Sequence, residues 1–137
     1  MDLTDIANKY ELDKGNLTNP SWQNIFPDHT AMGYTKHYEK YLEKWRNLPI
    51  QMMEIGIWDK RFQGCSIKMW KEYFTKAKIV GVDNFWGNNP NTIDVATKML
   101  SDKRTNIEYI DMGNRQNWKI LFSKYKSFDL IIEDAMF

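Results

Sequence analysis

The sequence predicts an α/β fold: a Rossmann-like parallel sheet of strand order 3-2-1-4, preceded by a helical N-terminal region. Two observations support this prediction. From residue 49 onward, apolar segments of strand length alternate with amphipathic segments of helical period, which is typical of right-handed β–α–β crossovers in a parallel sheet. The apolar segments also end on acidic residues, at the edge where open parallel sheets bind their ligands.

The composition sets limits on size, location and partners. The chain has 137 residues, of which 42% are apolar, and this suits one compact domain. A net charge of +1 provides no field for binding nucleic acid or a membrane surface. Cys65 is the sole cysteine, so no internal disulfide forms, and no apolar run approaches the ~20 residues of a membrane span. The acidic first residues do not resemble a signal peptide, and we expect a cytoplasmic protein.

Residues 1–48 are predicted to form a helical cap on a core of residues 49–137, the two together making one compact domain. Apolar residues at helical spacing predict two helices in the cap, over 3–12 and 34–45. A turn and an irregular loop separate them, at 13–16 and 19–29. The second helix is expected to present one apolar face, made of Tyr34, Tyr38, Tyr41, Leu42 and Trp45.

The core is predicted to hold four strands joined by three helices. Apolar runs predict the strands, at 51–57, 78–83, 106–111 and 128–134. Amphipathic segments between them predict the helices, at 64–74, 92–100 and 118–125. The first of these helices is expected to turn its large apolar residues inward, namely Ile67, Trp70, Tyr73 and Phe74.

The acids at the strand ends favour a ligand that carries hydroxyl groups and positive charge. The four strands end on Glu54, Asp83, Asp111 and Glu133-Asp134. A strand gains nothing from a terminal acid that has no partner. A dinucleotide such as NAD needs a tight glycine-rich turn for its pyrophosphate, and the loop over 58–63 lacks the G-x-G-x-x-G spacing. S-adenosylmethionine carries no phosphate, so the sequence favours it over NAD.

Each of these positions has an expected part in binding S-adenosylmethionine. Glu54 and Gly56 suit the methionine end, with its ammonium and sulfonium, and Asp83 is placed to accept both ribose hydroxyls. Asp111 is placed to receive the adenine amino group, although the segment 111–114 is also typical of a simple turn. The predicted cofactor-binding residues are Glu54, Gly56, Ile57, Ser66, Asp83 and Asp111. The loop aromatics would flank adenine or an acceptor, or merely cover the mouth of the sheet: Trp58, Phe62, Phe85 and Trp86.

Several segments resemble the macrocin-type O-methyltransferases, which are similar to the cephalosporin hydroxylase group. Glu54-Ile55-Gly56-Ile57 resembles the family's Leu-Glu-Ile-Gly strand, and Met69-Trp70-Lys71-Glu72-Tyr73-Phe74 resembles its Met-Trp-x-x-Tyr-Phe helix. Ile79-Val80-Gly81-Val82-Asp83 is similar to its acid-ended second strand, and Leu12-Asp13-Lys14-Gly15 to its Thr-Asp-Lys-Gly turn. The resemblance implies a class I S-adenosylmethionine-dependent enzyme that modifies sugars on macrolides.

The resemblance also implies a metal site and a base, and here the sequence departs from the family. The family's Asp-Asp-Gly-Ser-His segment is replaced by Glu133-Asp134-Ala135-Met136-Phe137. By resemblance, Glu133 and Asp134 are candidate ligands for Mg²⁺, and the family's remaining ligands would lie beyond Phe137. Phe137 stands at the position of the family's histidine, which is thought to act as a base, and it transfers no proton. No catalytic residue is therefore assigned.

The predicted sheet lacks the last strands of this class, which leaves the fourth strand as an edge. Two interpretations stay open: the chain is a fragment of a longer reading frame, or it is a complete short protein that pairs this edge with another copy in a homo-oligomer. The expected function is S-adenosylmethionine-dependent O-methylation of a hydroxyl on a sugar or small natural product. The alternative is a catalytically inactive module that binds S-adenosylmethionine or acts as an interaction protein.

Overall fold

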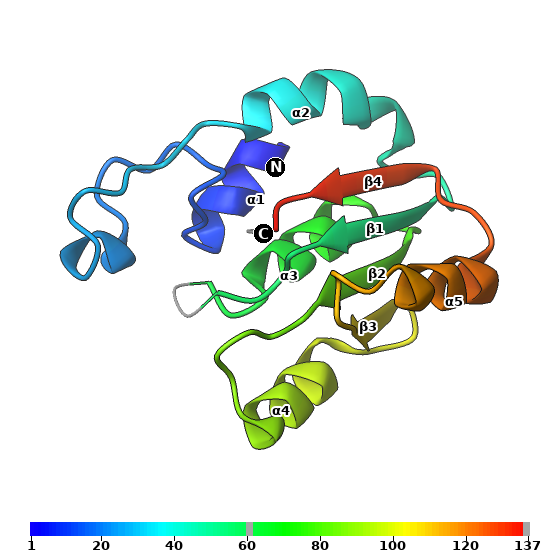
Figure 1. Cartoon of the computed structure of the whole chain (residues 1–137). Helices are drawn as coiled ribbons and strands as arrows, with labels where there is room; N and C mark the ends of the chain where they lie inside the picture. The colour runs from blue at the N-terminus through cyan, green and yellow to red at the C-terminus, as the bar shows by residue number, and fades with distance from the viewer. Residues whose placement is uncertain (60–61, 136–137) are drawn as a thin grey trace.

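A computed structural model, which describes residues 1–59 and 62–135, has a four-stranded parallel sheet at its centre (Figure 1). The strand order is β3-β2-β1-β4, as predicted. The strands are β1 (Gln51–Ile55), β2 (Lys78–Asp83), β3 (Thr105–Tyr109) and β4 (Leu130–Glu133). In the register of the sheet, Glu54 of β1 lies beside Gly81 of β2 and Ile132 of β4. The strand order reverses between β1 and β4, so the ligand crevice of an open sheet is expected there.

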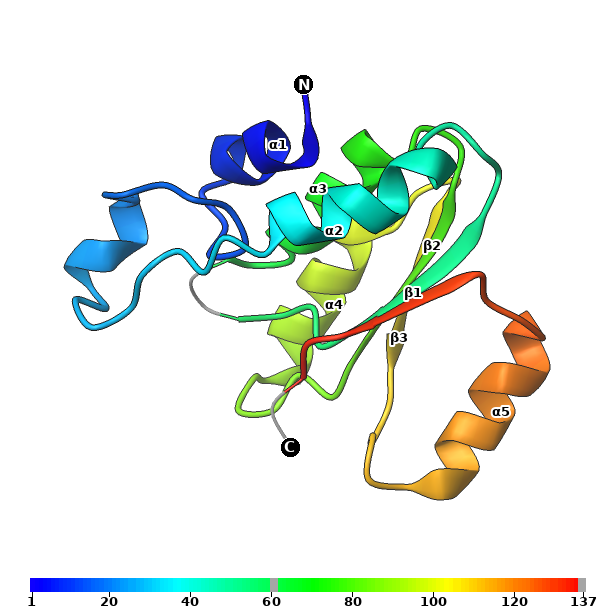
Figure 2. The same ribbon diagram turned by 90° about the horizontal axis from the view of Figure 1, so that it is seen from above.

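The helices divide unequally between the two faces of the sheet, as Figure 2 shows. One face carries α1 (Leu3–Lys9), α2 (Thr35–Leu42), α3 (Cys65–Tyr73) and α4 (Pro90–Leu100). The other face carries α5 (Arg115–Tyr125). Short 3-10 helices lie at Ser21–Asn24 and Glu43–Trp45. None of the helices in the described ranges is long and apolar enough to cross a membrane.

The core has one large and one small cluster of buried side chains. The large cluster lies between the sheet and the helices of the more crowded face, and it includes Ile67, Trp70, Tyr73 and Phe74, which are buried as predicted. The small cluster joins the sheet to α5 and consists of Met53, Val80, Val82, Met112 and Leu121. Alternation along β1 and β2 explains the division, because successive side chains of a strand point to opposite faces.

Several predicted boundaries were wrong by a few residues. The first helix ends at Lys9 instead of residue 12, and a 3-10 turn interrupts the loop predicted over 19–29. The third strand ends at Tyr109, so Asp111 lies two residues beyond it. The fourth strand covers only Leu130–Glu133 instead of residues 128–134. Strand ends depend on where backbone pairing with neighbours stops, which the apolar pattern does not reveal.

The predicted apolar face of the second helix was partly wrong. Leu42 is buried, but Tyr41 is 65% exposed and Tyr34 is also exposed, while the polar Thr35 is buried. Figure 1 shows α2 lying along β4, at the rim of the sheet. The buried residues of α2 are Thr35 and Leu42, so only a narrow stripe of this helix meets the core.

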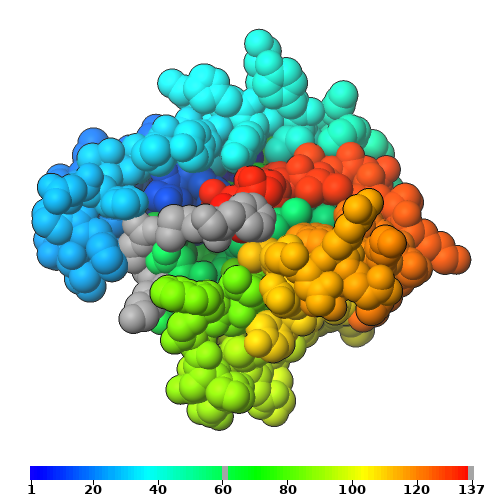
Figure 3. All heavy atoms as spheres, in the orientation of Figure 1, coloured from blue at the N-terminus to red at the C-terminus, as the bar shows by residue number. Residues whose placement is uncertain are grey.

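Strand β4 is accessible at the surface. Figure 3 shows its atoms exposed between α2 and α5, on the face turned to the viewer. Ile131 is 48% exposed, whereas Ile132, the next residue, is buried. An exposed apolar strand at a sheet edge is a place where another chain segment can pair.

Candidate cofactor-binding site

The site is built at the carboxyl-terminal edge of the sheet, where β1 and β2 end. Met52 and Ile79 belong to the large core cluster, and Glu54 and Asp83 each follow one of them at an even spacing. The period of two therefore places both acids on the same face of two adjacent strands. The structure brings together two residues that sequence reasoning assigned to one site.

Gly56 lets the segment after β1 pass close to the segment after β4. Its φ is +84°, a left-handed conformation that suits glycine. A Cβ on this residue would lie 2.6 Å from the Cα of Ala135 and 2.8 Å from the carbonyl carbon of Asp134. The Gly56 N–H donates to the Val82 carbonyl at 2.8 Å. The absence of a side chain is thus required by the neighbouring backbone at the switch point of the sheet.

Asp83 is 6% exposed and holds the loop that follows β1. Its Oδ2 accepts the backbone N–H groups of Ile57 and Trp58, both at 2.8 Å. Its Oδ1 accepts the N–H of Phe85 at 2.8 Å. A carboxylate has about four acceptor positions, so backbone donors fill three and about one remains. A ribose diol offers two hydroxyl donors, and binding both would require at least one of these N–H groups to be displaced.

Glu54 is fully buried and bound within the protein. Its carboxylate accepts hydrogen bonds from the Ser66 hydroxyl and from the Trp70 indole N–H, both on α3. Burial raises the pKa of Glu54, while the nearby Lys14 ammonium and the two donors act in the opposite direction. In this conformation neither Glu54 nor the Ser66 hydroxyl is accessible to a ligand, so any part they have in cofactor binding is indirect.

Lys14 is a charged residue of this edge to which sequence reasoning gave no role. It is 6% exposed, and its Nζ lies 2.5 Å from Oδ2 of Asp134 and 3.9 Å from Oδ1 of Asp13. Burial lowers the pKa of Lys14, but the charges of Glu54 and Asp134 outweigh this effect and raise it. Its place in the Asp-Lys-Gly turn was the one signal in the sequence that could have drawn attention to it.

Two other predicted residues lie apart from each other, Asp111 on the loop after β3 and Glu133 at the end of β4. Asp111 is exposed, and its Oδ1 accepts the N–H of Gly113 at 3.0 Å, as in a simple turn. Glu133 is exposed, and its Oε1 accepts the N–H of Ala135 at 2.8 Å. Within residues 1–59 and 62–135, no three or more His, Cys, Asp or Glu side chains are grouped so as to hold a metal ion. Glu133 and Asp134 therefore supply at most part of a metal site.

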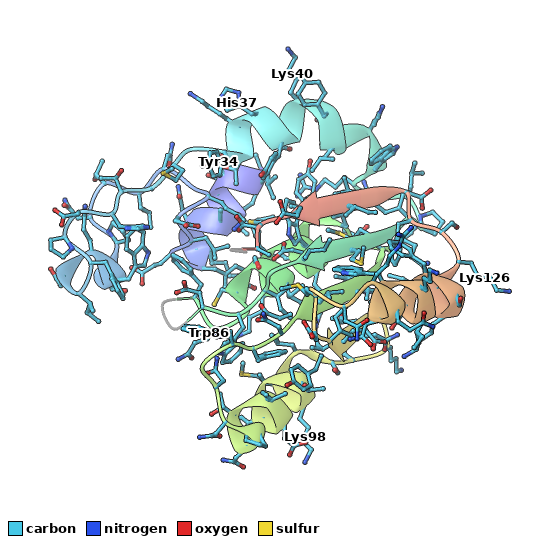
Figure 4. All side chains as sticks on the ribbon, viewed as in Figure 1. Tyr34, His37, Lys40, Trp86, Lys98 and Lys126 are labelled. Atoms are coloured by element: carbon cyan, nitrogen blue, oxygen red, sulfur yellow. The ribbon has the colours of Figure 1, made fainter. Side chains whose placement is uncertain are left out.

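The loop aromatics divide into packed and exposed residues. The rings of Trp58 and Phe85 lie 5.9 Å apart between centroids, and Phe85 lies 6.1 Å from Tyr109. Phe85 is buried, whereas Trp86 is exposed, and Figure 4 labels it on the loop after β2. Phe62, on the loop between β1 and α3, lies edge-on to Trp22 of the cap, with 5.6 Å between the ring centroids. Trp86 is thus the aromatic of this group most available to a ligand.

Comparisons with known proteins connect this chain to antibiotic O-methyltransferases. No family model matches it. It is 25% identical over 105 residues to mycinamicin VI 2''-O-methyltransferase of Micromonospora griseorubida, with 74% of this chain covered. It is 34% identical over 86 residues, 61% of the chain, to L-olivosyl-oleandolide 3-O-methyltransferase of Streptomyces antibioticus. A match to demethylmacrocin O-methyltransferase of Streptomyces fradiae covers 98% of the chain at 24% identity.

These matches involve only a part of each relative. The chain spans 24%, 19% and 29% of the lengths of the three curated relatives. Among solved structures, MycE methyltransferase in complex with Mg, S-adenosylhomocysteine (SAH) and Mycinamycin VI matches with a TM-score of 0.70 at 21% identity. That match covers 98% of this chain and 31% of MycE. The chain is therefore similar in sequence to macrolide and sugar O-methyltransferases over part of their length, and it shares the Rossmann-like fold of MycE methyltransferase.

Proposed function

We propose that the protein binds S-adenosylmethionine and takes part in O-methylation of a hydroxyl on a sugar or small natural product in the cytoplasm. The observation that carries the proposal is the position of Asp83 at the end of β2, beside Gly56 and on the same face as Glu54. Support comes from the sequence relatives and from the fold shared with a methyltransferase solved with SAH. The acids suit a ligand with hydroxyls and positive charge and do not suit a pyrophosphate.

In this proposal, the residues at the sheet edge bind and orient the cofactor. Asp83 receives a ribose hydroxyl once a loop N–H has moved, and Gly56 and Ile57 border the methionine end. Glu54 and Ser66 are buried and support the site without contacting the cofactor. Asp111 accepts a hydrogen bond from the adenine amino group. When bound, the cofactor supplies an electrophilic methyl group on a sulfonium. Catalysis then rests chiefly on holding the acceptor oxygen in line with that methyl group.

The proposal names no base and only two of the ligands that a metal site would need. The family's histidine corresponds to Phe137, which lies outside the described residues, so no base is named. Glu133 and Asp134 would contribute carboxylate oxygens to Mg²⁺, a hard cation that prefers oxygen ligands. Further ligands would have to come from other parts of the protein or from water and substrate. Magnesium dependence of methyl transfer, lost in Glu133→Gln, tests this assignment.

Calorimetry with SAH, S-adenosylmethionine and NAD tests the cofactor directly. We expect binding of the first two and none of NAD. Asp83→Asn is expected to weaken SAH binding more than tenfold, equivalent to about 1.4 kcal/mol. Asp94→Asn is a matched control, because Asp94 is exposed on α4 and pairs only with Lys98 among the interactions described. Equal affinities in the two variants would remove Asp83 from the site.

A second candidate function, an interaction module without catalysis, is favoured by two observations. The Asp83 carboxylate is largely filled by backbone donors. A groove of about 290 Å³ also opens along the edge strand, lined by Tyr38, Tyr41, Leu42 and residues 130–133. The module would act through the β4 edge, by pairing with a second copy of the chain. Absence of binding to both SAH and NAD, together with self-association in solution, would favour it.

A further inference from the structure

Lys14 reaches from the cap into the carboxyl-terminal edge of the sheet. Its carbonyl accepts the N–H of Thr35 at 3.1 Å, and Gly15 beside it accepts the N–H of Gly33 at 2.8 Å. These contacts fix its main chain against the start of α2. Its side chain then ends between the acids of two adjacent strands, contacting Asp134 after β4 and acting by charge on Glu54 in β1. One buried ammonium thus joins three separate segments of the chain.

We propose that Lys14 is a positioning residue for the methionine end of the cofactor site. Its ammonium holds Asp134 and the segment after β4 against Gly56, and it balances the charge of Glu54 at the same edge. The inference rests on the proposed function, because it assigns that edge to S-adenosylmethionine. The Lys14 ammonium binds Oδ2 of Asp134, which leaves Oδ1 for another partner.

Burial of an ammonium at this place is not explained by packing. A lysine is seldom buried without a charged partner, because removing its charge from water is costly. A methionine or leucine would fill a similar volume without that cost. The charge has a purpose only with respect to the acids around it. Of these, Glu54 lies in β1 and Asp134 follows β4, and these two strands flank the switch point of the sheet.

The geometry explains how loss of the Lys14 charge would affect ligand binding. The Asp134 N–H donates to the Ile55 carbonyl at 2.8 Å, and the backbone of 134–135 lies against the Cα of Gly56. If the Lys14 ammonium is lost, Asp134 is no longer held from the cap side. The segment after β4 can then move away from Gly56, and the border of the methionine end moves with it.

Two ligands that differ at the methionine end separate positioning from general stabilisation. We expect Lys14→Met to weaken SAH binding at least tenfold, measured per folded protein, and to change binding of 5′-methylthioadenosine less than twofold, because the latter lacks the amino-acid portion. Asp83→Asn is expected to weaken both. Lys9→Met is the matched control, since Lys9 also joins the cap to α3, through Glu72, but at an exposed position. Equal losses for the two ligands in Lys14→Met would overturn the proposal.

Amide hydrogen exchange provides a test that needs no ligand. We expect Lys14→Met to speed exchange of the Asp134 and Ala135 amides at least tenfold relative to Lys9→Met. The Ile79 amide, which donates to the Arg104 carbonyl at 2.7 Å near the other end of the sheet, should exchange at the same rate in both. A uniform increase at all three amides would overturn the proposal. Should Lys14→Met fail to fold, Asp134→Asn removes the charge partner and is expected to show the same local pattern.

The two tests also separate this inference from the proposed function. If the unmodified protein binds neither SAH nor 5′-methylthioadenosine, the proposed cofactor is wrong. The exchange pattern then still decides whether Lys14 holds the segment after β4.

Discussion

Replacing Gly56 by alanine tests the close approach of the segments that follow β1 and β4. The new Cβ would lie 2.6 and 2.7 Å from the Cα and N of Ala135, and 2.8 Å from the carbonyl carbon of Asp134. All three are backbone atoms, so no side chain can rotate away. The φ of +84° adds a second penalty of about 1–2 kcal/mol for a residue with a Cβ. Overpacking adds about 1–3 kcal/mol.

The sum predicts that Gly56→Ala loses about 2–5 kcal/mol of unfolding free energy. Urea unfolding measures this loss: with a slope of about 2 kcal/mol/M, a loss of 3 kcal/mol lowers the midpoint by about 1.5 M. Gly87→Ala is the matched control, because Gly87 has a φ of +77° but nothing within 4 Å of its added Cβ. It should lose only the conformational penalty. If both variants lost the same free energy, the packing argument at Gly56 would be refuted.

Further predictions concern the interior, the surface and the sheet edge. Trp70→Phe removes the indole donor from Glu54 and should lower the unfolding free energy by about 1–3 kcal/mol; a change below 0.5 kcal/mol in urea unfolding would contradict it. A hydrogen bond from Lys9 lowers the pKa of Glu72 below its usual 4.5, so the stabilisation is present above pH 4.5 and is lost as the pH falls through the folded-state pKa. Carboxyl carbon NMR should show the Glu72 pKa rising in Lys9→Met, and an unchanged titration would refute that cause. If the β4 edge pairs with a second copy, sedimentation should find a dimer that Ile131→Lys converts to a monomer; a monomeric unmodified protein would exclude this pairing.

Much of the fold could be predicted because it rests on local patterns. The apolar runs and helical periods located every strand and long helix, and the strand order was confirmed. Strand β2 was predicted with its correct ends, since Lys78 and Asp83 are polar residues at the two limits of an apolar run. The exposure of Tyr41 could not be predicted, because it depends on how α2 packs beside β4.

The arrangement of the candidate acids could be predicted, but their contacts could not. The acids at the ends of β1 and β2 do lie on one face, as strand alternation requires. The burial of Glu54 depends on Trp70 of α3, and the way these two side chains meet is set by helix–sheet packing. The three backbone donors on Asp83 depend on the path of a loop. Such contacts arise only in three dimensions.

The contact between Lys14 and Asp134 joins residues 120 positions apart, which has a consequence for synthesis on the ribosome. The turn that carries Lys14 leaves the ribosome early, yet its partner is translated only after the strands and helices between them. Contacts of such long sequence separation form late and slow the folding of a domain. Until then, the lysine stays hydrated and the turn that carries it lacks its partner Asp134. We therefore expect this turn to reach its final position last, after the sheet has formed around β1, while α1 can pack on α3 earlier.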